Sequence, residues 1–171
     1  MKKSRSLLGL VLSIGLVFSA QAESSNDEKY FSSVMTILRA HIDTLVHLTH
    51  TPSIHSDNVV RHALAIHQTM GLFDHLDWTP ERLSKLNVIN GDSQATSEEF
   101  NLFARQARKN SRNLVQASKQ WLDDGKRPAL LQALNELTTS CNHCHTQLKN
   151  RQAPILSTID IEHSPAVSPP S

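Results

Sequence analysis

The sequence predicts an all-α fold in which four helices form an antiparallel bundle. Four segments repeat apolar residues at helical spacing, and no segment alternates convincingly between apolar and polar residues as a strand does. The links between the first and second segments, and between the third and fourth, are short enough to join antiparallel neighbours. One bundle domain is therefore expected over residues 23–151.

The first predicted helix spans residues 26–50. Ser25 and Glu28 have the spacing of a capping box at its start, and Thr51 followed by Pro52 ends it. Its apolar residues recur at intervals of four and three, which is the narrow seam typical of helical bundles. This seam consists of Phe31, Met35, Leu38, Ile42 and Leu45.

The second helix is expected to start after Ser56, which is a suitable N-cap residue, with Asp57 in the first turn. It is expected to end near Leu76. Its apolar stripe consists of Val59, Ala63, Ile66, Met70 and Phe73. Residues 77–96 contain proline, glycine and several polar residues, so they predict a long connection with a short helical turn over 81–86.

The third helix has the clearest signals. Thr96 and Glu99 form a second capping box, and Gly125 to Pro128 predict a tight turn into the next helix, with Pro128 suited to its first turn. The apolar face consists of Phe100, Phe103, Ala107, Leu114, Ala117 and Trp121.

The fourth helix is predicted to run from this turn to about Arg151. Its inward positions are Leu131, Leu134, Leu137, Cys141, Cys144 and Leu148. Residues 152–171 are too rich in proline to continue a helix, and they predict a disordered tail.

Residues 141–145 read Cys-Asn-His-Cys-His, the Cys-x-x-Cys-His pattern to which c-type haem is attached. On a helix Cys141, Cys144 and His145 share one face, whereas His143 is rotated away from it. Two thiols at this spacing can each form a thioether with the haem, and the adjacent imidazole can reach the iron as proximal ligand. The motif therefore predicts one haem c, covalently bound near the C-terminal helix.

The cysteine pair has two other interpretations. A thioredoxin-like dithiol normally follows a strand, and no strand pattern precedes Cys141. A zinc site needs four ligands, so histidines would have to complete a haem-free metal site around Cys141 and Cys144. His47 and His50 share a helix face and form another candidate metal pair, although solvated helix surface is the simpler interpretation of the histidine-rich first half.

Residues 1–22 have the form of a signal peptide. Basic residues at the start precede an apolar run over 6–19, and Ala20-Gln21-Ala22 matches a signal-peptidase site. The apolar run is short for a transmembrane span, so an uncleaved anchor is the weaker alternative. Export to the periplasm agrees with the motif, because haem of this kind is attached outside the cytoplasm.

Removal of the leader changes the charge of the chain. Lys2, Lys3 and Arg5 leave with it, so 14 of the 17 basic residues remain against 16 acidic residues, a formal charge of −2. This balance provides no excess of basic residues for binding nucleic acid. The sequence also lacks a Ser-His-Asp order, a glycine-rich phosphate loop and a paired-carboxylate motif, so an enzyme is not expected.

A leader, four helices and a Cys-x-x-Cys-His motif in the last helix resemble the cytochrome c-prime family and its six-coordinate relatives. The resemblance covers about residues 26–151. Ordinary small cytochromes c differ, because they carry the motif near the N-terminus.

The resemblance implies roles for several positions. Met35 falls on the position that faces the distal side of the haem iron, after Tyr30 and Phe31. Phe31 stands where the family usually has the arginine that follows this tyrosine, and Lys149 takes the basic position four residues after the proximal His145. The family's frequent dimerisation through the first two helices implies a homodimer face, for which this chain offers Val46, Leu48, Val60 and Leu64.

The sixth coordination position decides between two functions. A thioether ligand from Met35 would give a low-spin iron of raised potential, suited to carrying single electrons to a redox partner that the sequence does not name. If Met35 only packs against the haem, a five-coordinate iron would bind nitric oxide or carbon monoxide, as in members of the c-prime type. Met70 is an alternative distal ligand, and His41 or His67 would give bis-histidine ligation.

Overall fold

The computed structural model describes residues 15–50, 57–75, 78–86, 97–125 and 127–147. Within these ranges the regular structure is entirely helical and contains no strand, which confirms the predicted all-α class. The elements are α1 (Gly15–His50), α2 (Asn58–Gly71), the 3-10 helix η1 (Leu72–His75), α3 (Pro80–Lys85), α4 (Ser97–Asp124) and α5 (Arg127–Gln147).

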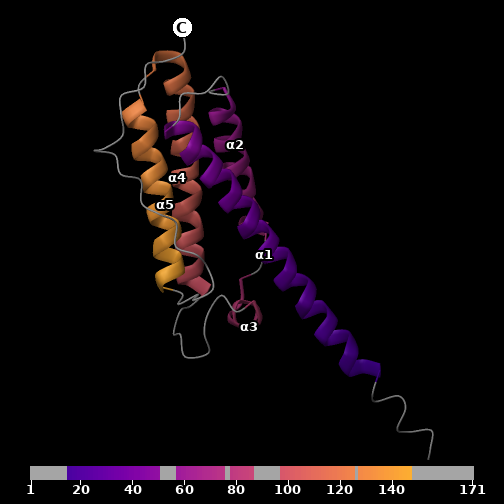
Figure 1. Cartoon of the computed structure of the whole chain (residues 1–171). Helices are drawn as coiled ribbons and strands as arrows, with labels where there is room; N and C mark the ends of the chain where they lie inside the picture. Colours follow the sequence, from indigo (N-terminus) through magenta and orange to yellow (C-terminus); the bar gives the residue numbers. More distant parts are fainter. Residues whose placement is uncertain (1–14, 51–56, 76–77, 87–96, 126, 148–171) are drawn as a thin grey trace, which may run out of the picture.

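The long helices pack in sequence order. α5 lies along α4, α4 also contacts α2, and α2 contacts α1, whereas α1 and α5 touch at few points (Figure 1). Figure 1 also shows that the N-terminal part of α1 extends past the other helices. Among the described residues no helix is long and apolar enough to cross a membrane.

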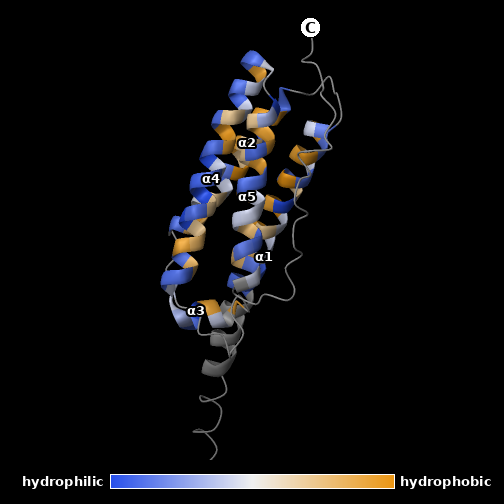
Figure 2. Ribbon diagram, turned by 90° about the vertical axis from the view of Figure 1, so that its left-hand side faces the viewer, coloured by the Kyte–Doolittle hydropathy of each residue, from blue (hydrophilic) through white to orange (hydrophobic). Residues whose placement is uncertain are grey.

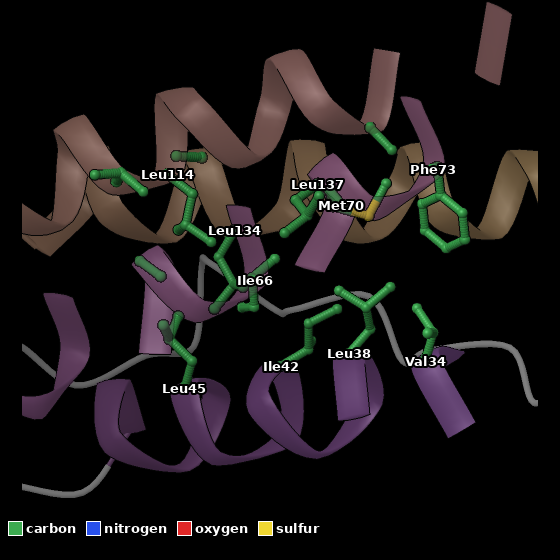
Figure 3. Close-up of a cluster of buried hydrophobic side chains, with 14 of the residues drawn as sticks. Val34, Leu38, Ile42, Leu45, Ile66, Met70, Phe73, Leu114, Leu134 and Leu137 are labelled. Carbon is green, nitrogen blue, oxygen red and sulfur yellow. The ribbon is translucent and has the colours of Figure 1, made fainter. Parts of the chain in front are cut away.

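Apolar side chains from all four long helices meet in one core. Figure 3 shows Leu45 of α1, Ile66 of α2, Leu114 of α4 and Leu134 of α5 pointing into the same space, and all four are fully buried. Hydrophilic residues cover the side of α4 that faces away from its neighbours (Figure 2). Burial of these stripes is the main force that holds amphipathic helices together.

The predicted stripes agree with the observed burial at most positions. In α1 the stripe residues are buried except Met35, which is partly buried, and Val34 joins them. In α4 only Phe103 of the predicted face is partly exposed. In α5 the leucines at 131, 134 and 137 are buried and both cysteines pack against the core, while Leu148 lies outside the described residues.

The predicted start of the first helix is wrong. α1 begins at Gly15, so Ser25 lies within the helix and not at its N-cap. The physical reason is that residues 16–24 contain neither proline nor glycine, and nothing there opposes helix propagation. Removal of residues 1–22 stays a prediction, and residues 1–14 of that leader lie outside the described part.

The start of α2 also differs slightly from the prediction. The helix begins at Asn58, and Asp57 takes the cap position instead of a place in the first turn. The Asp57 backbone is already helical (φ −62°, ψ −24°), and its side chain makes no capping hydrogen bond. The predicted cap residue Ser56 lies outside the described residues, as does Thr96 before α4.

The turn between α4 and α5 is the tight turn that the sequence predicts. Gly125 adopts φ 69°, a left-handed conformation that glycine accepts without strain, and its N–H donates to the Trp121 carbonyl at 2.9 Å. Arg127 N–H then donates to the Gly125 carbonyl at 2.9 Å, and Pro128 follows in the first turn of α5. The turn places α5 directly beside α4.

The short helical turn predicted over 81–86 is confirmed as α3. The Thr79 hydroxyl oxygen accepts a hydrogen bond from Arg82 N–H at 3.2 Å and so caps its start. Leu83 and Leu86 anchor this segment in the core, because both are buried. The rest of the connection, over 87–96, and the proline-rich residues 152–171 are not described.

The residues proposed for a dimer face are not equally available. Val46 and Leu48 pack against the core of the same chain, whereas Leu64 is more than one-third exposed. The homodimer stays a prediction.

Truncation of a core leucine should destabilise the protein strongly. Leu114→Ala removes a side chain that is fully buried at the centre of α4, and we expect a loss of about 2–5 kcal/mol in the free energy of unfolding. Leu102→Ala on the same helix is the matched control, because Leu102 is 57% exposed and its loss should change stability by less than about 0.5 kcal/mol. Urea unfolding measures both, and equal losses would contradict this core.

Candidate functional site

The Cys-x-x-Cys-His motif occupies the last turns of α5. Cys141 and Cys144 are free thiols that pack against the core, and His145 is partly buried beside them. His143 is exposed, and its ring stands edge-on to Phe103 of α4 with the centroids 5.0 Å apart. The spacing therefore turns both sulfurs inward and sends the remaining histidine of the motif to the surface.

Burial decides the ionisation of the two thiols. Desolvation raises the pKa of Cys141 to about 11. It also raises the pKa of Cys144 to about 12, with a smaller contribution from the neighbouring Cys141. Both side chains are thus protonated at neutral pH, whereas reactive redox dithiols and metal-binding cysteines need an accessible thiolate.

His145 has a ring nitrogen without a protein partner. Its Nδ1 atom is buried and makes no hydrogen bond within the described part of the chain. Burial also lowers the pKa of His145, so the neutral imidazole, the form that binds metal ions, is favoured at neutral pH. A buried and unpaired nitrogen is costly, and a bound group that contacts this nitrogen would relieve the cost.

Aromatic rings from four segments gather near the motif. Trp78 stands at their centre, with ring centroids 5.8 Å from Phe31, 5.8 Å from Phe73 and 4.4 Å from Phe100. We refer to these four residues as the aromatic cluster. Phe103, which contacts the motif through His143, follows Phe100 by one turn of α4, so the aromatic cluster and the motif lie at the same end of the core.

Sequence reasoning missed Trp78. It lies in the connection before α3, where no periodicity marks a buried position. Its indole Nε1–H donates to the Phe73 carbonyl at 2.7 Å, and the side chain is buried. A large aromatic residue within an otherwise polar connection could have indicated this buried position, because such residues are seldom left exposed to water.

Met35 and Met70 both contribute to the core at different depths. Met35 follows Phe31 by one turn of α1 and is partly buried against the core. Met70 of α2 is buried in the same core cluster as Leu137, which lies one turn before Cys141 (Figure 3). Lys149, predicted near the proximal face, lies outside the described residues.

The histidines named as alternative ligands have polar partners elsewhere. His41 Nδ1 lies 2.9 Å from His62 Nδ1, and His67 Nδ1 lies 2.9 Å from the Ser111 hydroxyl. His50 Nδ1 lies 2.8 Å from the Val46 carbonyl, next to an exposed His47. Across the described ranges no three His, Cys, Asp or Glu residues are grouped so as to hold a metal ion by themselves.

Comparison of the chain with models of protein families, with curated proteins and with solved structures gives no match. The resemblance to the cytochrome c-prime family stays a prediction from the motif and its position in the chain. The features that bear on function are therefore the motif, the neutral thiols and imidazole, and the aromatic cluster beside them.

The thiols should react slowly in folded protein that is produced without haem. With a pKa of about 11, Cys141 holds roughly two orders of magnitude less thiolate at pH 7.5 than an ordinary cysteine, and partial burial restricts access as well. Mass spectrometry after iodoacetamide treatment should show little labelling of the folded chain and two labels after unfolding in urea. Rapid labelling of the folded chain would contradict the buried thiols.

Proposed function

We propose that this protein is a periplasmic c-type cytochrome that carries single electrons. In this proposal one haem c is bound covalently through Cys141 and Cys144 at one end of an antiparallel four-helix bundle, and His145 is the proximal ligand of the iron. The supporting observation is that one helix face presents two inward thiols and an imidazole with an unpaired ring nitrogen.

The donor set fits a covalently bound haem. Thioether formation uses two neighbouring thiols, and both sulfurs are uncommitted to a disulfide. His145 would bind the iron through a neutral imidazole, the form that its burial favours. When bound, the haem supplies an iron that can be oxidised and reduced by one electron.

The aromatic cluster suits the apolar surface of a porphyrin. Its rings come from α1, η1, α4 and the segment before α3, so they enclose one end of the core from several sides. Such a wall excludes water, and a low dielectric around a haem favours the less charged ferrous state. The side chains would thereby hold the group and help to set its reduction potential.

Met35 is the proposed distal ligand. It is partly buried on α1, one turn beyond Phe31 of the aromatic cluster, and it carries a thioether sulfur that can bind iron. Met70 is more deeply buried on α2, where it packs as core filler. Ligation by Met35 would keep the iron six-coordinate, so that electron transfer needs little rearrangement of the site.

Loss of His145 should abolish the native haem spectrum, whereas loss of His143 should not. We expect the mature protein, produced in a host that attaches c-type haem, to carry the added mass of one haem and to show a Soret band. His145→Ala should change the spin state or prevent maturation, because the proximal ligand is gone. His143→Ala is the matched control within the motif, since His143 is exposed.

The absence of a covalent haem mass from the mature wild-type chain would refute the proposed function. Equal effects of His143→Ala and His145→Ala on the spectrum would contradict the assignment of the proximal ligand.

Replacement of Met35 tests the proposed distal ligand. The wild-type protein should show a low-spin spectrum with the weak far-red band of methionine ligation in the oxidised state. Met35→Ala should make the iron high-spin and open it to carbon monoxide, while Met70→Leu should leave the spectrum low-spin. The reverse result would assign the ligand to Met70, and a wild-type spectrum that is already high-spin and shifts with carbon monoxide would favour the gas-binding alternative.

A further inference from the structure

A pair of histidines joins α1 to α2 away from the Cys-x-x-Cys-His motif. His41 Nδ1 and His62 Nδ1 lie 2.9 Å apart, and the two ring centroids are separated by 5.1 Å with the planes at 58°. A contact this short between two imidazole nitrogens requires that one donates a proton and the other accepts it. Both side chains are partly buried, so water can still reach them.

The packing of the two helices fixes this pair in place. Ile42, next to His41, and Ala63, next to His62, are both buried in the core. The contact between α1 and α2 therefore sets the distance between the two backbones, and partial burial restricts the two rings. A pair of ligands held in advance loses little freedom when an ion binds.

The two rings present nitrogen atoms that a metal ion can bind. Burial lowers the pKa of His62, and the nearby His41 lowers it further, which favours the neutral ring of His62. A metal ion would take the lone pair of both Nδ1 atoms. The proton on the donating Nδ1 would move to Nε2 of the same ring through water, so that no proton is gained or lost by the pair.

We propose that His41 and His62 form a binding site for a divalent copper ion. Imidazole nitrogens bind metals at about 2.0–2.1 Å, so a metal bound to both Nδ1 atoms at a separation of 2.9 Å would see them at an angle of about 90°, once both rings have turned to direct their lone pairs at it. This angle is that of neighbouring positions in the square-planar or tetragonal geometry that Cu(II) prefers, whereas a tetrahedral zinc ion needs a wider separation. Water molecules complete the coordination, because the described residues offer no third protein ligand there.

The site is independent of the proposed haem. Neither histidine belongs to the motif or to the aromatic cluster, and His62 lies on α2, which carries none of the proposed covalent attachment. Copper binding would therefore persist if the chain held no haem, and a failure of copper binding would leave the proposed electron carrier untouched.

Titration with Cu(II) tests the site. The sample is the purified mature protein in its oxidised state, with the cofactor that it carries, and the buffer does not bind metals. Calorimetry should give one equivalent of bound copper, and electron paramagnetic resonance should show an axial Cu(II) signal with nitrogen ligands. His41→Ala and His62→Ala should each weaken binding at least tenfold. His47→Ala is the matched control, because His47 is an exposed histidine on the same helix as His41.

A further variant separates ligand loss from damage to the helix interface. His62→Gln keeps a polar side chain that can hydrogen-bond to His41 but is a poor copper ligand, so it should fold normally and still lose binding. Copper should raise the melting temperature of the wild type and of His47→Ala only. Wild-type affinity in His41→Ala or His62→Gln, or loss of binding in His47→Ala alone, would overturn the proposal.

Discussion

The packing of α5 against α4 is the interaction on which the other features of the molecule depend. Leu114 of α4 and Leu134 of α5 are fully buried between the helices, and the side-chain amide of Asn110 donates to the Glu136 carbonyl at 3.0 Å. The turn at Gly125 joins the two helices and limits how they can slide. Together these contacts fix which face of α5 looks inward, and that face carries both cysteines of the motif.

The low polarity of this environment gives the motif its chemical character. Burial favours the neutral thiol over the thiolate and the neutral imidazole over the imidazolium, because a charge is poorly solvated away from water. Two protonated thiols and a neutral imidazole are a weak redox dithiol but a suitable set for holding a haem. The same desolvation that stabilises the packed helices thus narrows the chemistry available at Cys141, Cys144 and His145.

α1 contributes residues to the proposed haem site and to the proposed copper site. Phe31 joins the aromatic cluster, Met35 packs against the core one turn later, and His41 meets His62 of α2 further along. α2 is the main helical neighbour of α1, since α1 touches α5 at few points, and Phe31 is held in addition by Phe73 and Trp78. A change in the contact between α1 and α2 would move the proposed distal ligand and the histidine pair together.

The sequence by itself determined the helices, their buried stripes, the glycine turn and the shared face of the motif, because these depend on periodicity and on neighbours within one or two turns. Only the tertiary structure decided the place of Trp78, the pairing of His41 with His62 and the burial that shifts the cysteine pKa values. These features join residues of different elements, and helical spacing holds no information about which helices meet. The start of α1 was also predicted wrongly. A capping pattern allows a helix to start at that point, but it does not stop a helix that continues upstream.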